Sequence, residues 1–114
     1  MSDAIIEKTH DAEHKKRWDI YYPDHRLFST ETVLQSIGRI VLERYGDVWN
    51  IELMDIVRPR LGYGTRLLDR VRDEMRCDLS VRPSSRSGCK FFEKYGATPC
   101  KGLLCATLLI SWNL

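Results

Sequence analysis

The chain has 114 residues, 43% of them hydrophobic and 30% charged, with a formal net charge of +2. This length fits one domain with one core, and the composition excludes a largely disordered chain. The first sixteen residues are too polar for a secretory signal and no apolar run is long enough to span a membrane, so we expect a cytoplasmic protein.

The N-terminal part of the chain predicts strands. Residues 1–16 are polar apart from residues 4–6, which fit either a short edge strand or a loose N-terminal arm. Residues 18–22 (WDIYY) are aromatic and β-branched, and Pro23 and Asp24 follow them. This combination predicts a short strand that ends in a turn.

Residues 33–44 (VLQSIGRIVLER) fit two structures. Their apolar spacing fits a helix, but Gly38 interrupts it and residues 40–42 are a β-type run. A turn signal at residues 45–47 and a long strand-like segment at residues 48–57 follow. We therefore expect a β-hairpin in which Gly38 marks a bulge or bend.

The C-terminal half predicts alternating helices and strands. Residues 62–76 are the clearest helix, because one apolar stripe is formed by Leu67, Leu68, Val71 and Met75. A short strand at residues 79–82 follows, and Ser84 or Ser85 caps a second helix that runs to residue 95 and ends at Gly96. Residues 103–112 form a last apolar strand. The order predicts a mixed α/β domain with a central βαβ crossover.

The turn between the long strand and the first helix, residues 58–65 (RPRLGYGT), has the features of an anion site. Two glycines, one residue apart, let the backbone approach a ligand closely. The first N–H groups of the helix lack intrahelical partners and carry partial positive charge, which suits a diphosphate. Arginines at positions 58, 60 and 66 add charge. The third glycine of a dinucleotide fold and the GK[ST] of a P-loop are missing, so those two classes are disfavoured.

These pieces together resemble the GNAT superfamily of N-acetyltransferases, whose pattern is a strand, an R/QxxGxG/A turn, a helix, a strand and a helix ending in YEKxGF. The matching segments are residues 51–57, 60–68 (RLGYGTRLL) and 91–97 (FFEKYGA). The resemblance covers roughly residues 38–112, and the compact size is similar to small acetyltransferases of phages and mobile elements. It implies a central, mostly antiparallel sheet with two main helices.

The resemblance also implies a function, the transfer of an acetyl group from acetyl-CoA directly to a primary amine of a protein lysine, a protein N-terminus or a small molecule. The backbone of Asp55, Ile56 and Val57 would pair with the pantetheine arm. The pyrophosphate would lie on the amides of Arg60, Leu61, Gly62, Tyr63, Gly64 and Thr65. Ser85 stands where many members have an asparagine that contacts the cofactor.

Two positions depart from the pattern. Pro59 stands where the family has its Arg or Gln, with Arg58 and Arg60 on either side. Phe92, in the expected cofactor site, occupies the position of the family's frequent general-acid tyrosine. Phenylalanine has no proton to give to the departing thiolate, so that role falls to Tyr95, Tyr63, Cys89 or water.

Two acids on the long strand are candidates for the general base that keeps the amine neutral. Glu52 and Asp55 lie beside the expected thioester. Their odd separation puts them on opposite faces of a flat strand, but a bulge would turn one of them. Glu52 is the first choice, acting directly or through water.

Two other functions stay open. The absent tyrosine is compatible with a catalytically silent acyl-CoA-binding or interaction domain. Six arginines between positions 58 and 76 are compatible with a nucleic-acid-binding module, although interspersed acids and an apolar stripe disfavour it. We expect no membrane partner and leave a homodimer open.

Several single residues have plain structural interpretations beside functional ones. His10 and His14 make half a metal site without a third ligand, so we expect no metal. Cys89 and the other three cysteines are expected to be reduced thiols, Cys89 in the core. Trp18, Tyr21, Tyr22 and Phe28 line either an acceptor groove or the core, and Trp112 is a core or dimer contact.

Overall fold

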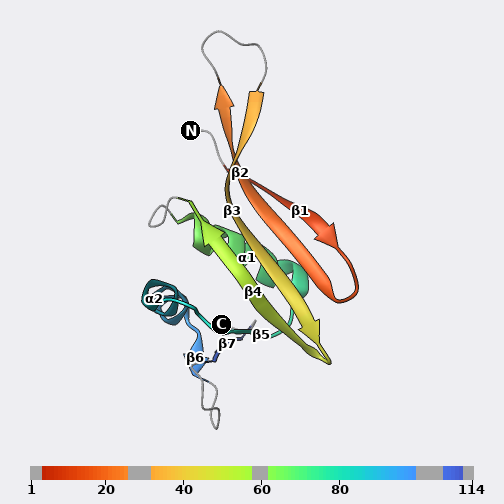
Figure 1. Cartoon of the computed structure of the whole chain (residues 1–114), viewed down its shortest axis with the longest axis vertical. Coiled ribbons are helices and arrows are strands. Elements are labelled where there is room, and N and C mark those ends of the chain that lie inside the picture. The colour runs from red at the N-terminus through yellow and green to blue at the C-terminus, as the bar shows by residue number, and fades with distance from the viewer. Residues whose placement is uncertain (1–3, 26–31, 58–61, 100–106, 112–114) are drawn as a thin grey trace.

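The computed structural model describes residues 4–25, 32–57, 62–99 and 107–111 (Figure 1). The elements are β1 (Ile5–Asp11), β2 (Lys15–His25), β3 (Thr32–Tyr45), β4 (Val48–Ile56), α1 (Tyr63–Met75), β5 (Leu79–Val81), α2 (Arg86–Tyr95), β6 (Thr98–Pro99) and β7 (Leu108–Ile110). They build one sheet in the order β1-β2-β3-β4-β5-β7-β6. Among the described strands, β4 and β5 are the one pair that runs parallel. The predicted class, a mostly antiparallel sheet with a βαβ crossover and two helices, is confirmed.

The N-terminal segment is not a loose arm. Residues 5–11 form the edge strand β1, which pairs with β2 from Ile5–Tyr21 to Asp11–Lys16. β2 also continues through Pro23 to His25, where we expected a turn. The described part of β1 pairs with β2 only as far as Tyr21, so no described strand lies beside Pro23 on that edge, where a residue without an N–H is tolerated.

The hairpin of β3 and β4 is confirmed, with Gly46 at φ 63° in its turn. The predicted irregularity at Gly38 is confirmed as well, since the β2–β3 register shifts between Gly38 and Ser36. A Cβ on Gly38 would lie 2.6 Å from Ile56 Cδ1 and 2.8 Å from the Asp55 carbonyl oxygen. Glycine is therefore required here by the close approach of β4.

The core lies between the sheet and α1. The predicted stripe of α1 is buried at Leu67, Leu68 and Val71, and Met75 is half-buried. Trp18 of β2 is fully buried against it, which confirms the core interpretation of this residue. Its indole N–H donates to Glu74 Oε2 at 3.1 Å, so α1 is joined to β2 by a hydrogen bond as well as by apolar contact.

The C-terminal elements follow the prediction with two differences. Ser85 is the N-cap of α2 and Gly96, at φ 117°, ends it. The strand β6 was not predicted; it pairs with β7 over two residues. Of the expected strand at residues 103–112, positions 108–110 form β7, while positions 103–106 and 112 lie outside the described residues.

Figure 1 shows α1 behind β2–β4, with no described helix on the near face of these strands. That near face carries the alternate side chains of β3 and β4, which are largely polar. Within the described residues, no helix is long and apolar enough to cross a membrane.

Candidate functional site

The parallel strands β4 and β5 pair over only three residues and then separate. Trp49, Asn50 and Ile51 pair with Leu79, Ser80 and Val81, and the pairing ends there. A cleft of about 130 Å³ opens beyond it, between residues 51–55 of β4 and residues 81–85. The separation begins after Ile51, and among the described residues no strand pairs with the β5-facing edge of β4 from Glu52 onward.

A bulge in β4 falls at Glu52. Val41 pairs with Leu53 and Leu42 with Ile51, so Glu52 is the extra residue. Asn50 and Asp55 consequently lie opposite Glu43 and Arg39, which are on one face of β3. Asn50 Nδ2 donates to Glu52 Oε1 at 2.8 Å, so both acids, Glu52 and Asp55, lie on the same face. The bulge that could turn one of them is confirmed.

Backbone groups of β4 alternate between β3 and the cleft. The Val57 N–H donates to the Ile37 carbonyl at 2.8 Å, so Val57 is directed toward β3. Alternation along the strand directs Asp55 toward β3 as well, and the N–H and C=O groups of Met54 and Ile56 toward the cleft. Of the three residues expected to pair with the pantetheine arm, Ile56 has its backbone groups directed away from β3, as does Met54, while those of Asp55 and Val57 face β3.

The N-terminus of α1 lies at the end of β4. Gly62 is its N-cap in the left-handed conformation at φ 80°, and neither a capping side chain nor an acidic residue occupies the first turn. The amides of Tyr63, Gly64 and Thr65 are thus free of side-chain caps and suit an anion. Gly64 also has a packing reason, because a Cβ there would lie 3.2 Å from the Phe91 ring. Arg60 and Leu61 lie outside the described residues.

The first turn of α2 forms the opposite wall of the cleft. Ser85 lines it, but its Oγ accepts the Gly88 N–H at 3.0 Å as the helix cap. One lone pair and the hydroxyl proton of Ser85 remain for other partners, including Ser87 at 3.2 Å. Phe92 also lines the cleft and is 5% exposed. The position expected to give a proton therefore presents an apolar ring.

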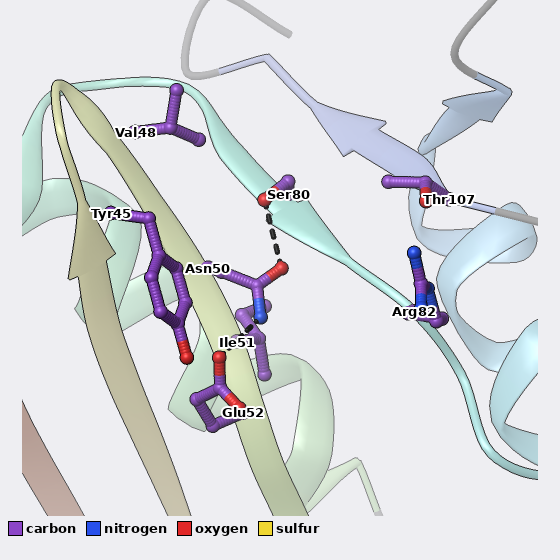
Figure 2. Close-up of a pocket in the computed structure, with 8 residues that line it drawn as sticks. All are labelled: Tyr45, Val48, Asn50, Ile51, Glu52, Ser80, Arg82 and Thr107. Atoms are coloured by element: carbon purple, nitrogen blue, oxygen red, sulfur yellow. Dashed lines mark hydrogen bonds between the residues drawn. The ribbon is translucent and has the colours of Figure 1, made fainter. Parts of the chain in front are cut away.

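Glu52 belongs to a polar cluster on the face opposite α1 (Figure 2). Ser80 Oγ donates to Asn50 Oδ1 at 2.8 Å, which leaves the Asn50 amide nitrogen to donate to Glu52. Tyr45 Oη donates to Glu43 Oε2 at 2.9 Å, and the Glu52 carboxylate lies near the same hydroxyl. The two carboxylates, Glu52 first, raise the pKa of Tyr45. Tyr45, Asn50 and Ser80 escaped sequence reasoning, since nothing in their spacing marks them.

Asp55 also lines the cleft but is engaged differently. Its carboxylate is 3.5 Å from the Arg39 guanidinium on β3, and 59% of its side chain is exposed. Asp55 is therefore engaged by a cation, whereas Glu52 accepts a hydrogen bond from the neutral Asn50 amide and lies where the β4–β5 pairing ends. This position makes Glu52 the first candidate for the base.

The alternative proton donors do not line the cleft. Tyr95 Oη donates to Asp69 Oδ1 at 2.5 Å and accepts from Arg72 at 3.1 Å, between the two helices. Burial and the bond to Asp69 raise the pKa of Tyr95 to about 12. Cys89 packs against the core and its Sγ is 3.5 Å from Glu93; burial and that acid raise the pKa of its thiol. Tyr63 also packs against the core.

The remaining predicted residues lie away from the cleft. Tyr21 is half-buried and Tyr22 exposed, and neither lines the cleft; Phe28 and Trp112 lie outside the described residues. His10 and His14 are exposed, and the described residues hold no group of three His, Cys, Asp or Glu that would bind a metal.

The arginines of α1 are largely used within the fold. Arg70 pairs with Glu74 at 2.8 Å, and Arg72 donates to Tyr95 and to the Ser111 carbonyl. A nucleic-acid surface needs arginines that are free to contact phosphates. The interpretation of this helix as a basic nucleic-acid module is therefore disfavoured.

No protein-family model and no curated protein sequence matches the chain. Solved structures do. A tyrosine-to-phenylalanine mutant of the toxin AtaT, bound to the C-terminus of the antitoxin AtaR and acetyl-CoA, matches with a TM-score of 0.69 at 15% identity, over 97% of this chain and 94% of that one. The KacTA–DNA complex matches with 0.68 at 15% identity, over 91% and 72%. The anti-CRISPR protein AcrVA5 matches with 0.54 at 18% identity, over 63% and 86%.

These similarities define the class of fold. The AtaT and KacT toxins have the GNAT acetyltransferase fold, and the agreement extends over most of the described chain. The chain has the GNAT fold, as its sequence resemblance implied.

Proposed function

We propose that the protein is an acyl-CoA-dependent N-acetyltransferase that moves an acetyl group from acetyl-CoA to a primary amine. The observation that carries the proposal is the cleft where β4 and β5 separate. One wall offers unpaired backbone groups, the Glu52 bulge lies at its closed end, and the uncapped N-terminus of α1 follows β4. The AtaT complex with acetyl-CoA supports the choice of cofactor for this fold.

Acetyl-CoA would be held by the backbone more than by side chains. The pyrophosphate would lie on the amides of Gly62, Tyr63, Gly64 and Thr65, which no side chain caps. Arg60 and Leu61 would complete the turn. The pantetheine arm would pair with the free edge of β4 as an added strand, using groups of Met54 and Ile56. Ser85 and Phe92 would form the other side of its channel.

Transfer would then occur in a ternary complex without a covalent enzyme intermediate. The amine nitrogen attacks the thioester carbonyl carbon, whose oxygen is polarised by the Met54 N–H, the nearer to Glu52 of the two cleft-facing N–H groups. The carbon–sulfur bond breaks, and the amine gives up a proton to Glu52 directly or through water. Because Phe92 has no proton, the CoA thiolate takes one from water. Thiols are far more acidic than alcohols, with a pKa of roughly 8.5 for the cysteine side chain, so a thiolate leaves without strong acid assistance.

Two titrations test cofactor binding. Calorimetry with acetyl-CoA should give a dissociation constant in the micromolar range, and acetyl-pantetheine, which lacks the diphosphate, should bind at least about 100-fold more weakly, as expected when charge-assisted bonds are lost. In an NMR titration the amides of Met54 and Ile56 should shift more than those of Asp55 and Val57. Absence of binding at high micromolar acetyl-CoA would refute the proposal.

Turnover is tested separately with a panel of amines and detection of free CoA thiol. Binding without any acetylated product would instead favour a catalytically silent acyl-CoA-binding domain. Phe92 makes this alternative important to test, because it has no proton to give to the departing thiolate. Mass spectrometry of cellular proteins after expression of the chain would identify a protein lysine or N-terminus as the acceptor.

A further inference from the structure

A polar groove of about 580 Å³ adjoins the cleft on the sheet face opposite α1 (Figure 2). It is lined by Tyr45, Val48, Asn50, Ile51, Glu52, Ser80, Arg82 and Thr107. Three of these residues, Ile51, Glu52 and Arg82, also line the cleft. The groove and the cleft therefore meet at the Glu52 bulge.

The groove offers the acceptor a route to the reaction centre. The other face of β4 is covered, because Ile51 is buried and Met54 packs against the core beside α1. The free edge of β4 would be occupied by the pantetheine arm. An amine that reaches Glu52 must then come across the open face, along the groove.

Arg82 is a charged residue of the groove for which the described residues provide no counter-ion. Most described arginines have a side-chain partner, among them Arg17 with Asp19 and Arg39 with Asp55. Within the described part of the chain, no hydrogen bond or ion pair is formed by the side chains of Arg76, Arg82 and Arg86, and of these only Arg82 lines the groove.

The opposite wall of the groove carries negative charge. Figure 2 shows Glu52 and Tyr45 on one side, Arg82 and Thr107 on the other, and Asn50 with Ser80 between them. Glu52 and Arg82 do not pair with each other, although both line both cavities. A groove with separated, unpaired charges of opposite sign is complementary to a ligand that carries both signs.

We propose that the acceptor is an amine that also bears an anionic group, a carboxylate or a phosphate. Arg82 binds the anion by charge-assisted hydrogen bonds while the amine lies at Glu52. Ser80, Asn50 and Thr107 offer neutral polar contacts between these two ends. This inference rests on the proposed transferase activity and narrows its substrate class; Arg82 determines specificity and takes no part in the proton transfer.

Matched pairs of amines that differ by one anionic group test the inference. L-lysine is compared with cadaverine for the carboxylate, and O-phosphoethanolamine with ethanolamine for the phosphate, using wild type, Arg82→Gln, Arg82→Lys and Arg86→Gln. Wild type should favour the anionic member of at least one pair by about tenfold in kcat/KM, mainly through KM, which is the effect of one exposed charge-assisted contact. Arg82→Gln should abolish the preference, Arg82→Lys restore part of it, and Arg86→Gln leave it unchanged.

The outcomes separate this inference from the activity on which it depends. A preference in only one pair identifies the anion as carboxylate or phosphate. Equal use of both members of each pair, or a preference that survives in Arg82→Gln, overturns the inference while the transferase proposal stands. A loss of acetyl-CoA affinity in Arg82→Gln, without a change in preference, assigns Arg82 to the cofactor and also overturns it. If acetyl-CoA binds but no amine reacts, the inference is tested by NMR titration of the four amines into the CoA-bound protein. Equal affinity for the anionic and neutral member of each pair, unchanged in Arg82→Gln, would refute it.

Discussion

Replacement of Glu52 by glutamine removes the carboxylate at the junction of cleft and groove and keeps the size of the side chain. The glutamine carbonyl can still accept the hydrogen bond that Asn50 Nδ2 gives to Glu52 at 2.8 Å, so its position should be retained. A positioned general base contributes about 10²- to 10⁴-fold to a rate. Glu52 is exposed, and water can replace part of its role, so the lower limit applies. We expect kcat to fall about 100-fold, which is roughly 2.7 kcal/mol of transition-state stabilisation.

The assay is steady-state release of CoA thiol from acetyl-CoA with an amine that wild type accepts, together with calorimetry of acetyl-CoA binding. The matched control is Glu43→Gln, because Glu43 also accepts a hydrogen bond from Tyr45 but lines neither cavity. The control should change kcat by less than about threefold, and both variants should bind acetyl-CoA like wild type. An equal kcat in Glu52→Gln and wild type would refute the role of this carboxylate. A parallel fall in both variants would assign the effect to the environment of Tyr45.

Three further outcomes are expected. Phe92→Tyr places a phenol in the cleft wall and should raise kcat, measured by thiol release. The gain should not exceed about tenfold, because a thiolate needs little acid assistance to leave. A rate no higher than wild type would contradict the assignment of this position to the proton donor. Glu74→Ala leaves the buried Trp18 indole N–H without its acceptor and should lower the free energy of unfolding in urea by about 2 kcal/mol more than Asp73→Ala, an exposed change on the same helix. Burial opposes ionisation of Asp19, but hydrogen bonds from the side chains around it outweigh burial and lower its pKa below 3.8. The ionised Asp19 should therefore stabilise the fold above pH 3.8, and this stabilisation should be lost as the pH falls through the lowered pKa. In acid-unfolding curves, Asp19→Asn should not show that loss of stability.

Local patterns predicted the parts of the fold that local chemistry determines. The apolar stripe of α1 and the caps of α2 at Ser85 and Gly96 each depend on residues a few positions apart. The extension of β2 through Pro23 was missed, since it is permitted by where β1 ends, a property of another segment. Proline ends a strand when its missing N–H is needed for pairing, and the sequence does not show whether a neighbouring strand needs it.

The candidate site was predictable along β4 and much less so across the sheet. Glu52 could be predicted because its position depends on one strand and one expected bulge in that strand. Tyr45 reaches the same groove from the end of β3 and Arg82 from the position after β5, and an isolated polar residue of this kind has no sequence signature. Tyr95 was predicted as a proton donor from its place in the sequence. The packing of α2 on α1 gives its hydroxyl Asp69 and Arg72 as partners, which the sequence does not show.

The bulge at Glu52 connects the packing of the core with the chemistry of the cleft. Ile51 and Met54 both face the α1 side of β4, opposite Leu42 and Ile40, although three positions separate them. A regular strand would turn one of them to the polar face, so burying both requires one extra residue. That residue is the acid at the end of the β4–β5 pairing, where the cleft begins. Moving the acid one position along β4 would therefore disturb the core as well as the site, and the position of the carboxylate is fixed by the same register that buries the apolar side chains.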